Sequence, residues 1–353
     1  MESIELLKKL ISFPSFSREN ANEAIRFVRD YLESFKIYGK IIENNGYYSY
    51  VTTIGSGKET LILNGHLDVV SGSNAQFIPK EKEGRIIGRG SADMKSGCVA
   101  MIQSIIRLKD VKLKNKIMLQ LVTDEETGGI NCTKHLVDTG YLGNFVICTE
   151  PTNLCISLQA KGIIRIDVIT KGKSAHGSRP WEGENAIIKA YDNYRKIKKL
   201  DILNKGSEFY ENSSVNLAFI NGGDIYNRVP DSSIMGFDIR YVPEIDPNKI
   251  IKAIQKCIEG EVIVKAIEPG VYGLKENKYT QKLSQSLKRV MPHMHIQYSV
   301  QHGGSDGRYY AQKGIPIVEF GPKGNYWHGD DEYVEIQSVK DLEEVLVDFI
   351  KVF

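Results

Sequence analysis

Strand and helix patterns alternate along the first 160 residues, and this alternation constrains the fold more than any other feature. Short apolar runs predict buried strands at 61–65, 116–123 and 144–151. Amphipathic or apolar stretches of helical period separate them, at 21–36, 94–108 and 130–138. Apolar strands joined by helices predict a three-layer α/β domain with a mainly parallel sheet that helices cover on both faces.

The pattern changes between residues 161 and 269. Strand, helix, two strands, helix and strand follow one another there, the order of a ferredoxin-like α+β sandwich. After residue 270 the α/β pattern resumes, with helices at 278–290 and 338–353 around a strand at 315–322. We therefore expect residues 1–160 and 270–353 to form one domain and residues 161–269 to be inserted in it as a second. Small-ligand sites commonly lie between domains.

Composition excludes several classes of function. The 46 basic and 44 acidic residues leave a formal charge of +2, which predicts neither a nucleic-acid partner nor an anionic membrane surface. No run approaches the roughly 20 apolar residues of a membrane span, and the first residues lack a signal-peptide core. Five scattered cysteines without a C-x-x-C motif indicate reduced thiols. These features predict a cytoplasmic protein.

Histidines and carboxylates follow the predicted strands. In an open α/β sheet, ligands bind outside the carboxyl ends of the strands, so these side chains should converge there. The Gly-rich turn "GRGSADMKSG" adds Asp93, and the segment "GNYWHGDDEY" adds His328. The residues concerned are His66, Asp68, Asp93, Asp124, Glu125, Glu126, Glu150 and His328.

Each of these residues also has an ordinary structural explanation. His66 and Asp68 could cap a strand with a hydrogen bond, Asp93 could cap a helix, and Glu150 could be a surface residue. "GRGSADMKSG" could be a phosphate-binding loop, but it matches neither glycine-rich phosphate template. If all these explanations held together, several carboxylates would lie close to one another at one sheet edge without a cation, which is electrostatically unfavourable. Bound metal removes that difficulty.

Charge counting favours two divalent ions. Asp93 is the candidate shared ligand, with His66 and Glu150 on one ion and Glu126 and His328 on the other. Two such ions balance three carboxylates and one hydroxide. The remaining carboxylate, Glu125, is the candidate general base, and Asp68 the candidate orienter of the His66 ring. Mixed imidazole and carboxylate ligands suit zinc best, with cobalt or manganese feasible.

The motifs "GHLDVV", "GRGSADMKSG", "TDEETGG" and "TEP", followed by a late histidine, resemble a di-zinc metallopeptidase family. That family contains succinyl-diaminopimelate desuccinylase, acetylornithine deacetylase and related carboxypeptidases and dipeptidases. The resemblance is collinear across nearly the whole chain. It implies the ligand set above and a catalytic domain interrupted by a ferredoxin-like lid through which two chains dimerise. It also implies a cis peptide after Asp93.

The resemblance extends to residues expected to contact substrate. The segment "GKSAHGSRPWEGENAI" is similar to the one whose histidine, here His176, stabilises the oxyanion in a neighbouring subunit's site. Without the family, an exposed loop histidine would be the simpler interpretation, and an arginine beside a strand could equally be a surface ion pair. The loop "GGSDGRYY" resembles the substrate loop of the desuccinylase. The implied substrate-binding residues are Arg179, Asn227, Arg240, Gly304, Ser305 and Arg308.

These features predict a two-metal amidohydrolase that removes a short acyl group from an N-acyl amino acid. Several arginines suit a substrate with three carboxylates, so succinyl-diaminopimelate is the expected substrate. Acetylornithine or acetyl-lysine deacetylation and carboxypeptidase or dipeptidase activity remain alternatives within the same chemistry. A non-catalytic binding protein and a nucleotide-binding α/β protein are further alternatives, and the complete ligand set and the failed phosphate motifs argue against them.

Overall fold

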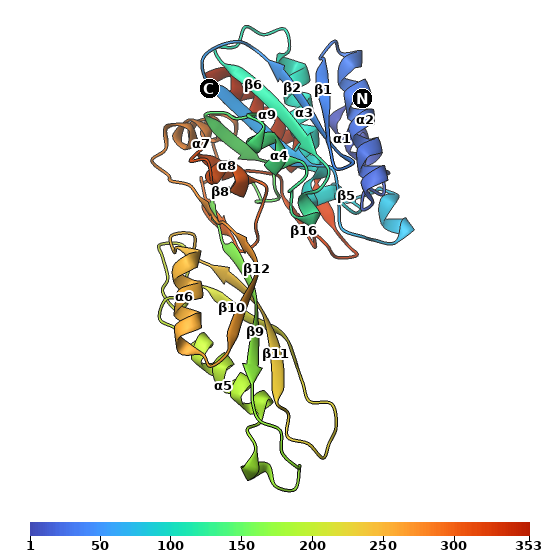
Figure 1. Ribbon diagram of the computed structural model, residues 1–353. Helices are drawn as coiled ribbons and strands as arrows, with labels where there is room; N and C mark the ends of the chain where they lie inside the picture. The colour runs from blue at the N-terminus through green and yellow to red at the C-terminus, as the bar shows by residue number, and fades with distance from the viewer. The chain divides into compact units, whose positions relative to one another are not determined.

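The structure, a computed structural model, describes residues 1–353 and divides into two compact units. The main unit comprises Met1–Leu158, Gly273–Ser299 and Ser305–Phe353. The inserted unit comprises Gln159–Tyr272 and Val300–Gly304. Figure 1 shows both, and each is described by itself below.

A mixed sheet forms the centre of the main unit, with its strands in the order β1-β2-β6-β3-β7-β15-β8. The four central strands β6, β3, β7 and β15 are mutually parallel, whereas β1, β2 and β8 pair antiparallel at the edges. The predicted parallel arrangement therefore holds for the centre of the sheet. The strands are β1 (Gly39–Asn44), β2 (Tyr47–Ile54), β3 (Thr60–His66), β6 (Lys116–Val122), β7 (Phe145–Cys148), β8 (Ile156–Ala160) and β15 (Ile317–Glu319). Two short strands, β13 (Val271–Tyr272) and β14 (Tyr298–Gln301), both pair with β8.

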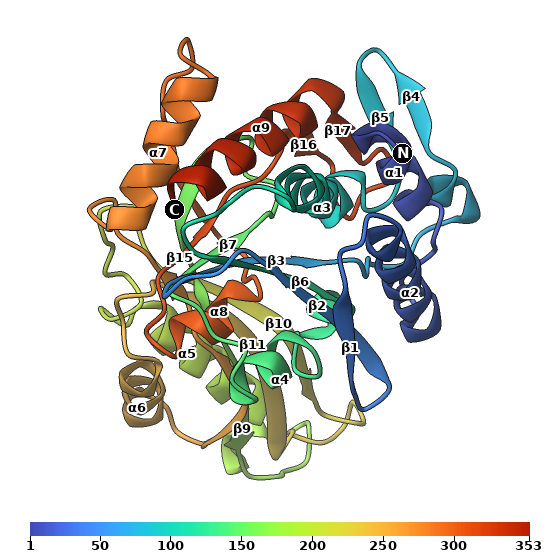
Figure 2. The same ribbon diagram turned by 90° about the horizontal axis from the view of Figure 1, so that it is seen from above.

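Helices cover both faces of this sheet, as Figure 2 shows from above. On one face α3 packs against α1 and α9, and α9 packs against α7. On the other face α4 packs against α8. Ser17 accepts a hydrogen bond at the start of α2 and Asn277 does so at the start of α7, as helix-capping residues do. The helices are α1 (Ser3–Ile11), α2 (Arg18–Ser34), α3 (Ser96–Leu108), α4 (Thr133–Asp138), α7 (Lys278–Val290), α8 (Gly307–Ala311) and α9 (Ile336–Val352).

A second, small antiparallel sheet links two distant segments of the main unit. Its strands are β16 (Gly324–Asn325), β17 (Tyr333–Glu335), β5 (Arg85–Ile87) and β4 (Lys80–Lys82), in that order. Because β17 pairs with β5, the loop after β5 lies beside the loop before β17. These two loops carry Asp93 and His328.

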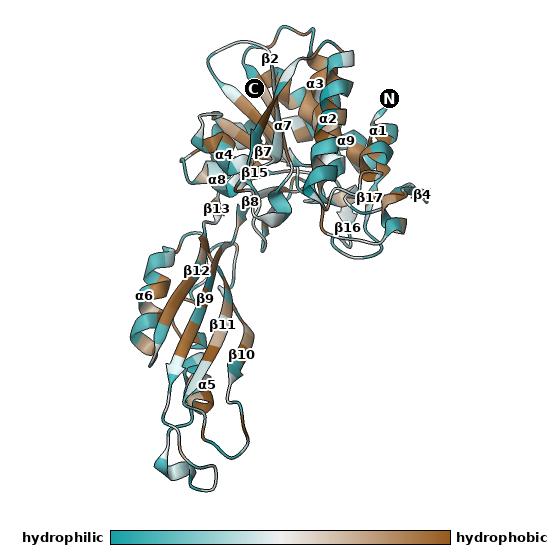
Figure 3. Cartoon of the chain, turned by 45° about the vertical axis from the view of Figure 1, so that its right-hand side comes forward, coloured by the Kyte–Doolittle hydropathy of each residue, from teal (hydrophilic) through white to brown (hydrophobic).

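The inserted unit is a ferredoxin-like sandwich with strand order β10-β11-β9-β12. Its elements are β9 (Gly162–Lys171), α5 (Ala186–Lys198), β10 (Ser214–Gly222), β11 (Ser232–Tyr241), α6 (Pro247–Cys257) and β12 (Glu261–Glu268). Alternate residues of β9 and β11 are buried beneath the two helices, including Ile164, Ile166, Met235 and Phe237. Figure 3 shows the hydrophobic residues along these strands. This chain order is the predicted one.

The elements that sequence patterns missed include α1, the edge strand β1, its neighbour β2 and the whole small sheet. Residues 300–304 group with the inserted unit, where the Tyr210 hydroxyl donates to the Gln301 carbonyl at 2.9 Å. None of the helices is both long and apolar enough to cross a membrane.

Candidate metal centre

Three neighbouring parallel strands deliver the site at their carboxyl ends. β3 ends at His66, while Glu125 and Glu126 lie in a short 3-10 turn (Glu125–Thr127) just after β6. Glu150 lies two residues beyond the end of β7. Because β3 pairs in parallel with both β6 and β7, these ends meet at one edge of the sheet.

The loop before α3 supplies Asp93. Gly90 begins it with φ of 79°, a left-handed conformation that suits glycine. A Cβ added at Gly90 would also lie 2.6 Å from Val69 Cγ1, so the position has no room for a side chain. The Asp93–Met94 peptide bond is cis, as the family resemblance implied. The loop directs the Asp93 carboxylate at two histidines.

Two groups of potential ligands share Asp93 (His66, Asp93 and Glu150; Asp93, Glu126 and His328), and within each group the ligand atoms lie within 4.8 Å of one another. His66 Nε2 lies 3.2 Å from Asp93 Oδ1 and 3.8 Å from Glu150 Oε1. His328 Nε2 lies 3.3 Å from Asp93 Oδ2 and 3.3 Å from Glu126 Oε1. The grouping is the one expected from the sequence.

Protonation in this cluster is strongly perturbed. Burial lowers the pKa of His66, but the nearby carboxylates of Asp93 and Glu150 outweigh this effect and leave the pKa well above its usual value. The nearby carboxylates of Asp93 and Glu126 raise the pKa of His328 to about 10. Burial raises the pKa of Glu150 to about 7. Protons on the imidazoles thus offset the carboxylate charges, the task that a cation performs in a metal site.

The donor atoms fit divalent metal ions. Glu126 Oε1 is buried and accepts no hydrogen bond, although His328 Nε2 is close to it. Buried carboxylate oxygens normally have partners, so an orphan aimed at a histidine indicates a ligand position. Imidazole nitrogens with carboxylate oxygens are the set that zinc, cobalt and manganese accept. The residues present therefore fit two ions that share Asp93.

Asp68 differs in detail from the sequence prediction. His66 Nδ1 lies 2.9 Å from the main-chain carbonyl of Asp68 and 3.6 Å from its carboxylate Oδ1. The carbonyl is thus the group at hydrogen-bond distance from the ring. The Asp68 carboxylate instead accepts the backbone N–H of Glu126 at 2.9 Å. The reason is that β3 ends at His66, so strand alternation does not extend to residue 68. Asp68 thereby connects the two ligand segments.

Arg308 lies inside the main unit and not on an open substrate surface. Its side chain is 4% exposed, and Nη1 lies 3.7 Å from Glu125 Oε1. The same guanidinium donates to the carbonyls of Ser305 and Gly128, at 3.1 and 2.8 Å. Burial raises the pKa of Glu125 well above its usual value, and the guanidinium partly opposes that rise. The structure thus places Arg308 against the candidate base.

The other two loop residues predicted to bind substrate differ in exposure. Gly304 is exposed and belongs to the inserted unit, whereas Ser305 is buried in the main unit. Ser305 Oγ donates to Glu319 Oε1 at 2.5 Å. Asp306, next in the chain, accepts a hydrogen bond from Thr133 Oγ1. This loop therefore packs its side chains inward behind Glu125.

The candidate residues of the inserted unit are mostly exposed. His176 Nδ1 accepts the Ser178 backbone N–H at 3.2 Å, which leaves the ring proton on Nε2. Arg240 Nε donates to Asp238 Oδ1 at 2.6 Å, and Arg179 lies 3.5 Å from Glu182. The Asn227 carbonyl accepts the Gly177 N–H at 2.7 Å. Both arginines therefore have carboxylate partners within their own unit.

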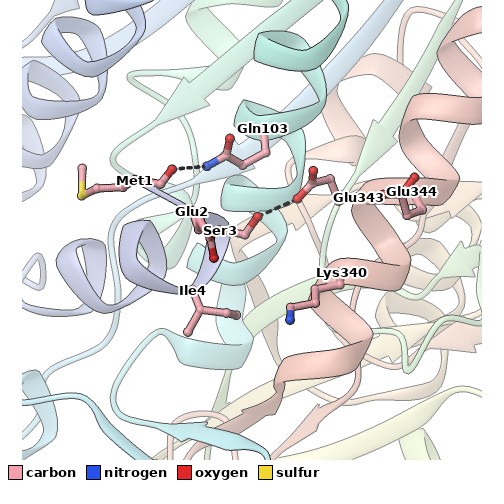
Figure 4. Close-up of a pocket in the computed structure, with 8 residues that line it drawn as sticks. All are labelled: Met1, Glu2, Ser3, Ile4, Gln103, Lys340, Glu343 and Glu344. Carbon is pink, nitrogen blue, oxygen red and sulfur yellow. Dashed lines mark hydrogen bonds between the residues drawn. The ribbon is translucent and has the colours of Figure 1, made fainter.

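Sequence reasoning missed Arg89 and Glu332, a buried ion pair beside the ligand loops. Their signal was weak: a single arginine between glycines, and a glutamate four residues after His328. A separate cavity of about 420 Å³ is lined by Met1–Ile4, Gln103, Lys340, Glu343 and Glu344. Figure 4 shows these residues and the hydrogen bond that Ser3 donates to Glu343. It contains none of the candidate metal ligands.

An α/β unit with two carboxylate–histidine groups at its strand ends, interrupted by a ferredoxin-like unit, defines a class of metal-dependent hydrolases. The chain belongs to peptidase family M20/M25/M40, whose model matches residues 62–352. It is 29% identical over 364 residues to a succinyl-diaminopimelate desuccinylase of Wolinella succinogenes, covering 98% of each chain. A protein of the same name from Nautilia profundicola is 28% identical over 367 residues, covering 99% of each.

Solved structures agree on the fold. Aminopeptidase PepT from Bacillus cereus superposes with a TM-score of 0.84 at 19% identity, covering 99% of this chain and 97% of that one. At this identity the likeness concerns the fold alone. The chain is a metallohydrolase of the M20 family, with a full-length match to the desuccinylases.

Proposed function

We propose that this protein hydrolyses N-succinyl-L,L-diaminopimelate to succinate and the free diamino acid, using two metal ions. The observation that carries the proposal is the pair of ligand groups that share Asp93, with Glu125 next to the ligand Glu126 in one 3-10 turn. The full-length match to relatives named succinyl-diaminopimelate desuccinylase supports the choice of acyl group.

His66, Asp93 and Glu150 would hold one ion, and Asp93, Glu126 and His328 the other. Zinc suits this set best, and cobalt or manganese could replace it. When bound, the ions supply Lewis acidity for the amide carbonyl and lower the pKa of the attacking water.

Glu125 is the proposed general base. A carboxylate in a low-dielectric site with a raised pKa can take a proton from water and return it to the leaving nitrogen. Its position is supported by Arg308, which is itself fixed by the carbonyls of Ser305 and Gly128. Arg308 would therefore act through Glu125, keeping its carboxylate oriented and opposing the rise in its pKa.

His176 is the proposed donor to the oxyanion. Because Ser178 N–H donates to Nδ1, the neutral ring presents its proton on Nε2, as an oxyanion donor must. Following the family resemblance, we propose that a partner subunit supplies this histidine.

A dimer through the inserted unit is supported by the edge strand β10, which pairs on one side only. Its residues from 218 to 222 are exposed, and Ile220 is 41% exposed. The adjoining α5 exposes Ile188 and Tyr191. An unpaired strand edge beside apolar side chains is a surface that a second copy can extend by two-fold pairing. Sedimentation analysis of an Ile220→Lys variant tests this, since a charge at that edge should give a monomer.

Substrate carboxylates are the proposed ligands of Arg179, Asn227 and Arg240. The ion pairs of both arginines are within their own unit and partly exposed, so a substrate carboxylate can compete for them. Gly304 and Ser305, in the loop 303–310, are the remaining proposed substrate-binding residues. The five free cysteines are in keeping with a reducing, cytoplasmic location.

The test is a substrate screen with zinc- and cobalt-loaded protein. N-succinyl-L,L-diaminopimelate should give the highest kcat/KM among that compound, acetylornithine, acetyl-lysine and several dipeptides. A higher value for acetylornithine or acetyl-lysine would make the protein a deacetylase of the same chemistry, and one for a dipeptide would make it a peptidase. Absence of hydrolysis of every compound by protein shown to hold two ions would contradict the proposed class.

A further inference from the structure

The Glu332 carboxylate is buried and fully bonded beneath the loop that carries Asp93. It is 1% exposed. Its Oε1 accepts the backbone N–H groups of Ala92 and Asp93 at 3.0 and 3.1 Å, and its Oε2 accepts that of Gly90 at 3.0 Å. Three contacts of this kind fix the backbone of the loop, and with it the direction of the Asp93 side chain.

Arg89 connects the same carboxylate to the other ligand loop. Its Nη1 donates to Glu332 Oε2 at 2.9 Å, and its Nη2 donates to the main-chain carbonyl of His328 at 3.1 Å. The guanidinium is 3% exposed. One planar group therefore spans from the anion under Asp93 to the backbone of His328, which a single ammonium headgroup could not do.

A buried ion pair is weak evidence for stability, because removing two charges from water offsets most of their attraction. It is therefore informative that this pair lies between two loops whose ligand atoms, Asp93 Oδ2 and His328 Nε2, are 3.3 Å apart. The two loops are distant in sequence, and the small sheet and these contacts hold them together. Accurate ligand placement is the property that such an outer shell provides.

We propose that Arg89 and Glu332 are positioning residues that hold Asp93 and His328 in register for metal binding. The inference rests on the proposed two-metal site and concerns the ion of the Asp93, Glu126 and His328 group above all. Asp93 serves both ions, but His328 serves only this one. Loss of the Arg89–Glu332 pair should therefore lower the affinity for this ion more than the affinity for the other ion.

The experiment compares the wild-type protein with an Arg89→Met/Glu332→Gln double variant, which removes both buried charges together. Metal-free protein is titrated with Co²⁺ and followed by visible absorption and calorimetry. The wild type should bind two ions. The double variant should bind the first ion with a small loss and the second roughly 10- to 100-fold more weakly. When the double variant is saturated with Co²⁺, its kcat should be lower than that of the wild type, and its KM should differ by a smaller factor.

A control removes another, more exposed ion pair of the main unit. Arg107 Nη1 lies 2.9 Å from Glu343 Oε1, and this pair joins α3 to α9, away from both ligand loops. The Arg107→Met/Glu343→Gln variant should change the melting temperature and leave both cobalt affinities at the wild-type values. An equal loss of affinity in this control would mean that general destabilisation explains the effect, and would overturn the positioning role.

A single variant keeps the test informative if the double variant does not fold. Arg89→Lys keeps a positive charge near Glu332 but cannot also reach the His328 carbonyl, so it should show an intermediate loss of the second ion. Wild-type affinity for both ions in a folded Arg89 or Glu332 variant would refute the inference. Failure of the wild type to bind two ions would instead refute the proposed function.

Discussion

Arg308 Nη1 lies 3.7 Å from Glu125 Oε1, inside a part of the main unit where the arginine is only 4% exposed. The buried guanidinium of Arg308 therefore interacts with Glu125, the candidate general base. It also explains why the loop after Gly304 turns its side chains inward. The fixed guanidinium favours the ionised form of Glu125. Because Glu125 is in neither ligand group, the effect of replacing it can be tested separately from metal binding.

Replacing Glu125 with glutamine should reduce kcat by roughly two to four orders of magnitude, because the amide keeps the shape and cannot take the proton. Elemental analysis should find both metal ions still bound, since Glu125 belongs to neither ligand group. Near-native turnover in this variant would show that another group acts as the base.

Asp93→Asn should reduce the occupancy of both metal ions, because Asp93 is common to both ligand groups. Dialysis followed by elemental analysis measures this directly. Chelator treatment of the wild type should abolish hydrolysis, and added Zn²⁺ or Co²⁺ should restore it. Activity that survives complete chelation would contradict a metal mechanism.

Mixed dimers test the proposed supply of His176 by a partner subunit. Glu125→Gln and His176→Ala proteins should each be nearly inactive alone. Unfolding and refolding them together should recover activity, because one site in a mixed dimer then has both residues intact. Dimers shown by mass spectrometry to be mixed, yet inactive, would exclude supply in trans.

Arg240→Ala should reduce kcat/KM for the succinylated substrate by a factor equivalent to more than about 2 kcal/mol, if its guanidinium binds a substrate carboxylate. The matched control is Arg165→Ala, because Arg165 pairs with the same Asp238. Equal effects of the two variants would point to loss of the local ion-pair network and against substrate binding.

Glu319 gives the metal-free protein a pH-dependent stability. Burial raises its pKa from 4.5 to about 8. The unfolded state therefore loses this proton first, and folded stability falls as pH rises from about 4.5 towards 8. Glu319→Gln keeps the acceptor for Ser305 and removes the charge.

The variant should match the wild type near pH 4.5 and exceed it at pH 8. Between these limits its advantage in the free energy of unfolding should grow by about 1.4 kcal/mol for each rise of one in pH. Urea unfolding of chelated protein across this range measures the difference, with the exposed Glu23→Gln as control. A constant difference at all pH values would contradict the assignment.

Sequence patterns were sufficient where burial is complete. The central strands β3, β6 and β7 are largely apolar runs, so the strands and their polar ends were predicted together. The edge strand β1 contains only exposed and half-buried residues, and β4 is wholly exposed with three residues. Such segments carry too little apolar signal to identify from a single chain.

The ligand set was predictable because each member follows a strand or a glycine turn. Arg308 was predicted to contact substrate, but its burial beside Glu125 was not predictable. A motif reports residue type and spacing and gives no indication of which side chains are buried. The Asp68 contact differs in detail from the prediction for a related reason, since alternation is lost where a strand ends. Arg89 and Glu332 form a long-range pair, and only tertiary structure brings them together.

The late position of His328 has a consequence for biosynthesis. During translation, His66, Asp93, Glu126 and Glu150 leave the ribosome well before His328 and the strand β17 that anchors its loop. Until then one ligand group is complete and the other lacks its histidine. The His66, Asp93 and Glu150 group therefore has all its members once residue 150 has been made, whereas the Asp93, Glu126 and His328 group can be completed only after residue 328 has been made.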